Sequence, residues 1–68
     1  MGTIAKISEI SCQSTKSFED AITTGISRAN KTLRQIESAW VKEMKVAVEG
    51  GNVKAYQVNL LVTFVLDE

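Results

Sequence analysis

The feature of this sequence that most limits its fold is the dipeptide Gly50-Gly51, which separates two long apolar-rich runs, residues 38–49 and 52–66. Gly-Gly between two β-type segments is typical of a two-residue hairpin, because a type I′ turn requires positive φ at both positions. The C-terminal half of the chain is therefore expected to form one long antiparallel β-hairpin.

The N-terminal half predicts one further strand and one helix. Residues 3–10 carry three isoleucines among polar residues, and this β-branched content favours a strand. Residues 11–17 are rich in turn and capping residues, so we expect a loop there. Ser17 is a candidate N-cap. Apolar residues then recur at spacings of three and four over residues 18–35, which predicts an amphipathic helix.

The predicted helix carries charges that suit its dipole, with Glu19 and Asp20 in the first turn and Lys31 and Arg34 near the end. Gly25 lies within its apolar stripe, where glycine costs about 1 kcal/mol relative to alanine. We expect this glycine to allow close packing of the helix backbone on a sheet.

The hairpin register assigns side chains to the two faces of the sheet. If the ladder continues from the turn without a bulge, Trp40 lies opposite Leu61, and Met44 lies opposite Gln57. One face then carries Trp40, Lys42, Met44, Val46, Val48, Val53, Ala55, Gln57, Asn59, Leu61 and Val65. The opposite face holds most of the bulky aliphatic residues and is the natural partner of the helix: Val41, Ala47, Tyr56, Val58, Leu60, Val62, Phe64 and Leu66. A β-bulge would reverse these faces beyond it.

The chain is expected to be a single domain, residues 1–68, that completes its core by association. A chain of this length buries only about 60% of its unfolded surface, and small proteins supplement such a core with disulfides, a metal or partner subunits. One cysteine, Cys12, and no histidine leave neither an internal disulfide nor a zinc site. One helix covers one sheet face, so the apolar face with Trp40 should be buried against other copies or a ligand. We predict a homo-oligomeric α+β protein.

Composition also argues against several classes of function. Eight basic and eight acidic residues give zero net charge, which is unlike a nucleic-acid binder. We see no signal-peptide pattern, and the longest apolar run is too short for a membrane span, so a cytoplasmic protein is expected. Without histidine there is no Ser-His-Asp set, and no phosphate-binding glycine loop is present. Cys12 is expected to be an exposed, inert thiol in the loop. We predict a non-enzyme with no catalytic or metal-binding residues.

Three segments of the sequence resemble the dodecin family: residues 14–21 (STKSFEDA), residues 28–34 (RANKTLR), and the last strand from residues 56–58 (YQV) to residues 64–67 (FVLD). The resemblance covers almost the whole chain. It implies a β-α-β-β fold, with a three-stranded antiparallel sheet wrapped around one amphipathic helix and twelve copies in a hollow shell. It also implies non-enzymatic flavin binding and storage (FMN or riboflavin), with the flavin stacked between tryptophans of neighbouring subunits.

The resemblance carries over to individual residues in part. Gln57 matches the glutamine that contacts the edge of the flavin ring. The stacking tryptophan of the family aligns with Ser38, and Trp40 lies two residues later on the same face, about 6.6 Å along the strand. The implied flavin site therefore consists of Trp40 and Gln57, with Ala39 and Met44 as further lining residues.

An alternative reading keeps the dodecin fold without flavin binding. In that case Trp40 packs between subunits of a structural shell, which holds a cation or another ligand. Three glutamates, one copy of each per chain, could gather around a symmetry axis and bind a hard cation: Glu37, Glu43 and Glu49. Lys42 and Lys45 could meet the phosphate of FMN, although lysines on a long hairpin are more often solvated.

Overall fold

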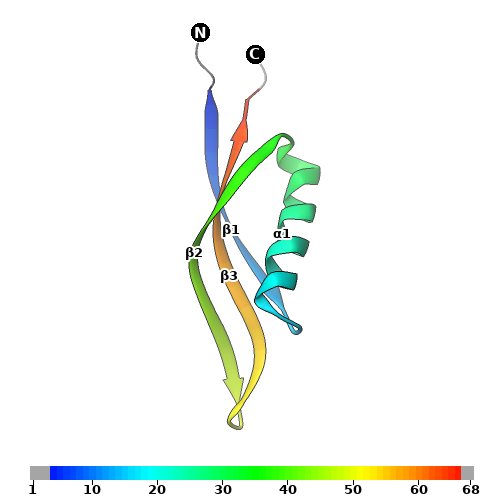
Figure 1. Ribbon diagram of the computed structural model, residues 1–68, viewed down its shortest axis with the longest axis vertical. Helices are drawn as coiled ribbons and strands as arrows, with labels where there is room; N and C mark the ends of the chain where they lie inside the picture. The colour runs from blue at the N-terminus through cyan, green and yellow to red at the C-terminus, as the bar shows by residue number, and fades with distance from the viewer. Residues whose placement is uncertain (1–3, 67–68) are drawn as a thin grey trace.

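The computed structural model describes residues 4–66, which form β1 (Ala5–Ser14), α1 (Phe18–Leu33), β2 (Ile36–Glu49) and β3 (Asn52–Val65). The strands pair antiparallel in the order β1-β3-β2, so the last strand is central. Helix α1 lies along one side of the sheet, and the β2–β3 hairpin projects beyond it (Figure 1). The predicted β-α-β-β fold, with a three-stranded antiparallel sheet and one helix, is confirmed.

Strand β1 runs further than the sequence suggested. Residues 11–14 were expected to belong to a loop, but they pair with β3 and extend the strand to Ser14. Long-range pairing with the central strand overrides the local turn preference of these small polar residues. Thr3, where the predicted strand begins, lies outside the described residues. The prediction of an exposed Cys12 is also wrong, because this residue lies in β1 and is only 7% exposed.

The start of α1 is capped as predicted. Ser17 has extended backbone geometry, and its Oγ accepts a hydrogen bond from the Asp20 backbone N–H at 2.9 Å. The helix ends two residues earlier than predicted, because Arg34 and Gln35 have positive φ values of 59° and 46°. Arginine and glutamine rarely adopt positive φ, and no glycine stands at this end of the helix. The sequence therefore did not indicate where the helix ends.

Helix α1 packs on the sheet face that we call the covered face, whose central residues are Cys12, Val58, Leu60 and Val62. Relative exposure is 0% for Val58, Leu60 and Val62. Ala21 packs against this cluster from the helix. A Cβ added at Gly25 would collide with the Cys12 Sγ. The expected close approach of the helix backbone to the sheet is therefore confirmed, and it occurs at Cys12.

The hairpin turn is as predicted, with positive φ at Gly50 (59°) and Gly51 (80°). The ladder beyond it contains three bulges, at Lys54 on β3 and at Lys42 and Glu37 on β2. The bulges at Lys54 and Lys42 lie on opposite strands and cancel, so Trp40 still pairs with Leu61 as predicted.

Between these two bulges the pairing is displaced by one residue. Met44 pairs with Val58 instead of Gln57, and Val46 pairs with Tyr56. A one-residue displacement moves side chains to the other face of a sheet. The prediction that Met44 and Val46 share a face with Trp40 is therefore wrong.

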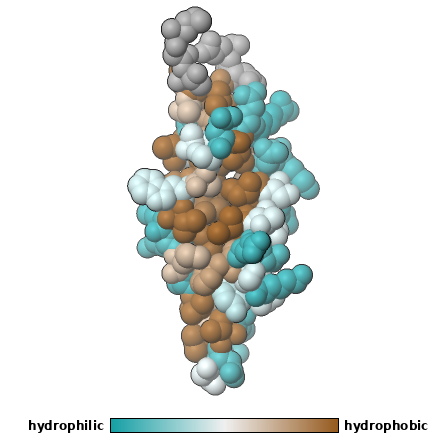
Figure 2. All heavy atoms as spheres, in the orientation of Figure 1, coloured by the Kyte–Doolittle hydropathy of each residue, from teal (hydrophilic) through white to brown (hydrophobic). Residues whose placement is uncertain are grey.

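The chain is elongated, with principal extents of 54 × 19 × 13 Å and a radius of gyration of 14.1 Å. A compact chain of this length would have a radius of gyration of about 11 Å. Every residue of β2 after Ile36 is exposed, and hydrophobic atoms continue along the molecule to the hairpin end (Figure 2). Much apolar surface of the sheet therefore remains uncovered by the chain itself.

Candidate functional site

The sheet face opposite α1, which we call the open face, brings together the residues predicted to bind a ligand. Its side chains form four rows that cross β1, β3 and β2 in that order: Gln13, Gln57 and Lys45; Ser11, Asn59 and Glu43; Glu9, Leu61 and Trp40; Ile7, Thr63 and Ser38. The two rows nearer the hairpin turn are polar throughout. The open face therefore joins a polar region to a region that contains Trp40.

Trp40 lies on β2, the edge strand, and is 73% exposed. The structure places it on the same face as Gln57, as the sequence predicted. Its partner Leu61 is four residues from Gln57 along β3, which corresponds to about 13 Å. A planar ring stacked on Trp40 would therefore reach Gln57 of the same copy only if the ligand extended along the sheet. Otherwise the ring would contact a second copy of the chain.

Gln57 borders a pocket of about 270 Å³ that is lined by Gln13, Lys45, Val46, Ala47, Ala55 and Gln57. Lys45 has no ion-pair partner among residues 4–66. By contrast, Lys42 pairs with Glu9 at 3.2 Å and Lys54 lies 3.6 Å from Glu49. Of these three hairpin lysines, the one beside Gln57 keeps its ammonium group available to a ligand.

Side-chain hydrogen bonds link residues of the two polar rows across the strands. Gln57 Nε2 donates to Ser11 Oγ at 3.1 Å, and Asn59 Nδ2 donates to Glu43 Oε1 at 2.8 Å. Asn59 Oδ1 is buried and has no hydrogen-bond partner within the described chain. These two hydrogen bonds tie the side-chain amides of the central strand β3 to β1 and to β2.

Two of the predicted site residues lie elsewhere. Ala39 pairs with Val62 and Met44 pairs with Val58, so both are on the side of β2 that belongs to the covered face. Sequence reasoning had not singled out Ser11 or Gln13, because both belong to the segment interpreted as a loop. Their alternation with Cys12 was the only available signal of a strand.

The glutamates considered for a cation do not converge within one chain. Glu49 lies beside the hairpin turn, whereas Glu43 is hydrogen-bonded to Asn59 in the middle of the sheet. No group of three potential His, Cys, Asp or Glu ligands occurs in the part of the chain that the structure describes. A cation bound by these residues would therefore require carboxylates from several copies.

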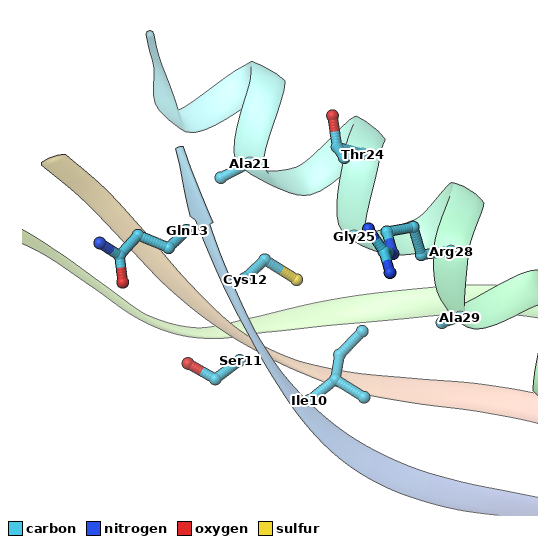
Figure 3. Close-up of a pocket in the computed structure, with 9 residues that line it drawn as sticks. All are labelled: Ile10, Ser11, Cys12, Gln13, Ala21, Thr24, Gly25, Arg28 and Ala29. Atoms are coloured by element: carbon cyan, nitrogen blue, oxygen red, sulfur yellow. The ribbon is translucent and has the colours of Figure 1, made fainter. Parts of the chain in front are cut away.

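A second pocket, of about 350 Å³, lies between β1 and α1 and includes Ile10, Cys12, Gly25 and Arg28. Cys12 projects into the space between strand and helix, while Ser11 and Gln13 point the other way (Figure 3). Burial raises the pKa of the Cys12 thiol. A thiol kept protonated in this way is a poor nucleophile.

The family model for dodecin matches residues 4–67. The dodecin of Thermus thermophilus is 40% identical over 68 residues, which are 100% of this chain and 99% of that protein. The chain belongs to the dodecin family. The resemblance noted in the sequence is thereby confirmed.

Solved dodecin structures have the same fold as this dodecin. A variant of the Thermus thermophilus protein gives a TM-score of 0.92 at 39% identity, covering 98% of this chain and 100% of that chain. The Streptomyces davaonensis dodecin gives 0.94 at 29% identity, with full coverage of both chains. A calcium-chelating dodecin from Mycobacterium tuberculosis, with a calcium-binding site, gives 0.82 at 28% identity, covering 94% and 91%. Within residues 4–66, this dodecin has no helix with the length and hydrophobicity of a membrane span.

Proposed function

We propose that twelve copies of this dodecin assemble into a shell that binds flavin reversibly, without catalysis, at subunit interfaces. The observation that carries the proposal is the exposed Trp40 on the same uncovered sheet face as Gln57. Large apolar side chains that the chain leaves exposed on a sheet, here Trp40 and Ile7 of the open face, are typical of an interface or a ligand site. The unpaired, buried Cys12 suits storage in the reducing cytoplasm.

The chemistry of the open face suits a flavin. The indole of Trp40 offers a flat polarisable surface for ring stacking. The amide of Gln57 and the ammonium of Lys45 lie in one row, so the row offers both an acceptor and donors to the uracil-like edge of the ring. Lys45 also offers a charge to the phosphate of FMN. Because Ala39 and Met44 lie on the other side of β2, we assign ring contact to Trp40 and Gln57.

The proposal is tested by native mass spectrometry of the purified protein with FMN or riboflavin. We expect a twelve-subunit species that carries flavin. Fluorescence titration of Gln57→Ala should then show affinity weakened by about 1–3 kcal/mol, the cost of an unmade hydrogen bond to a buried polar edge. Asn52→Ala, at the hairpin turn, is the control and should keep the parent affinity. An unchanged dissociation constant in Gln57→Ala would remove this residue from the site.

A flavin-free shell that holds a cation is the second candidate, and it is favoured by the calcium-chelating relative from Mycobacterium tuberculosis. It predicts the same twelve-subunit species without flavin, and calcium retained after exhaustive dialysis. In that case, moving the indole with Ser38→Trp and Trp40→Val should create flavin binding that the parent lacks. Quenching of flavin fluorescence by the parent protein would exclude this candidate.

A further inference from the structure

The hydrogen bond from Gln57 to Ser11 joins the central strand to β1 on the open face. Gln57 Nε2 donates to Ser11 Oγ at 3.1 Å, between residues 46 positions apart in the sequence. A glutamine side chain has three rotatable bonds and loses much conformational freedom when it is ordered. A partner on the neighbouring strand therefore restrains the Gln57 amide before any ligand arrives.

The Ser11 hydroxyl accepts its hydrogen bond from Gln57, and not from Asn59, although Asn59 lies nearer in the ladder. Asn59 lies directly opposite Ser11 in the ladder, but its Nδ2 donates to Glu43 on the other side of β3 at 2.8 Å. The two amides of the central strand are thus held in opposite directions, Asn59 toward β2 and Gln57 toward β1. Gln57 Oε1 keeps its acceptor capacity, since no hydrogen bond to it occurs among residues 4–66.

We infer that Ser11 is a positioning residue that fixes the Gln57 amide for the ligand. The consequence for affinity rests on the proposed flavin function, whereas the restraint itself is a property of the ligand-free protein. Ordering the amide in advance removes part of the entropy loss that accompanies ligand binding. Ser11 itself need not touch the ligand.

The restraint is tested first without flavin. Ser11→Thr and Ser11→Val have nearly the same shape and β preference, and they differ in the hydroxyl group. The chain has three glutamines, at positions 13, 35 and 57, so selective ¹⁵N-glutamine labelling gives three side-chain amide signals, and Gln57→Ala assigns the relevant one. We expect the Gln57 side-chain heteronuclear NOE to stay high in the parent and Ser11→Thr and to fall clearly in Ser11→Val. Equal values in the two variants would overturn the inference.

Flavin titration then measures the consequence for the ligand. We expect Ser11→Val to bind FMN about two- to twelvefold more weakly than Ser11→Thr, the range that corresponds to one net hydrogen bond. The difference should vanish when both changes are made in a Gln57→Ala background. A difference that persists there would show that Ser11 acts independently of Gln57 and would overturn the positioning role.

The amide dynamics test the restraint by Ser11 separately from the proposed flavin binding. If the parent protein binds no flavin, the proposed function fails, and the amide dynamics still decide whether Ser11 restrains Gln57. Native mass spectra of both variants check that assembly is unchanged. Should the valine variant not fold, Ser11→Ala replaces it, with the same expected loss of order at Gln57.

Discussion

The two faces of this sheet share the same central strand but differ in what covers them. On the covered face, Leu60 and its neighbours have no exposed surface because α1 packs over them. On the open face and along β2, Trp40 is 73% exposed and Val48 is 62% exposed. Helix α1 therefore covers one face of β1 and β3, but it leaves β2 beyond Ile36 and the opposite face of the sheet without a covering element in the chain. The open face is where we propose association and ligand binding.

Adjacent leucines of β3 give the strongest test of this comparison, because Leu60 lies on the covered face and Leu61 on the open face. Leu60→Ala should lower the free energy of unfolding by about 2–5 kcal/mol, since it removes a fully buried side chain and leaves a cavity. Leu61→Ala should cost less than half as much. Urea denaturation at one fixed protein concentration measures both variants, because the stability of an oligomer depends on concentration.

Equal losses of unfolding free energy in the two leucine variants would contradict the difference between the two faces. They would mean that the open face is packed in the assembly as tightly as the face under α1. In that case, the loss in Leu61→Ala should shrink on dilution of the assembly, whereas the loss in Leu60→Ala should not.

The close approach of α1 to the covered face at Gly25 gives the second prediction. In an open helix position, Gly25→Ala would stabilise the protein by up to about 1 kcal/mol. Here the added Cβ collides with the Cys12 side chain, so we expect Gly25→Ala to destabilise the protein by about 1–3 kcal/mol. Thermal denaturation monitored by circular dichroism measures the change.

A compensating variant checks the cause. Gly25→Ala combined with Cys12→Gly removes both colliding atoms, so the double variant should lose less stability than the sum of the two single changes. Additive losses would show that the collision between helix and strand is not the reason that glycine is required.

The parts of the fold that sequence reasoning predicted are those with a local physical signature. Gly50 and Gly51 mark the turn through their backbone freedom, and Ser17 marks the helix start through its side-chain oxygen. The apolar alternation of β3 correctly assigned Leu60 to the covered face and Leu61 to the open face. Each of these features depends on residues close together in the chain.

The features that were missed depend on pairing between distant residues. The bulges at Lys42 and Lys54 contain no glycine and leave no local signal, yet they moved Met44 to the other face. Similarly, the polar stretch that includes Ser11 became a strand because β3 offered it a partner. For the candidate site, Trp40 and Gln57 were correctly predicted to share a face, because Trp40 pairs with Leu61 and no bulge interrupts β3 between Gln57 and Leu61. The contact of Ser11 with Gln57 required the sheet order.

The smallest effect on stability should come from ionisation of the Cys12 thiol on the covered face. Burial raises the pKa of this thiol in the folded protein above its value in the unfolded chain, so the folded state favours the protonated form. The stabilising contribution of the neutral thiol is fully present below the unfolded pKa, about 8.5. It is lost as the pH rises through the folded pKa. The stability advantage of the parent over Cys12→Ala should therefore narrow between pH 7 and pH 10 in urea denaturation. Both proteins share every other titrating group, so these groups do not contribute to the difference. A stability advantage that stays constant over this pH range would show that water reaches the thiol on the covered face as readily as a side chain on the open face.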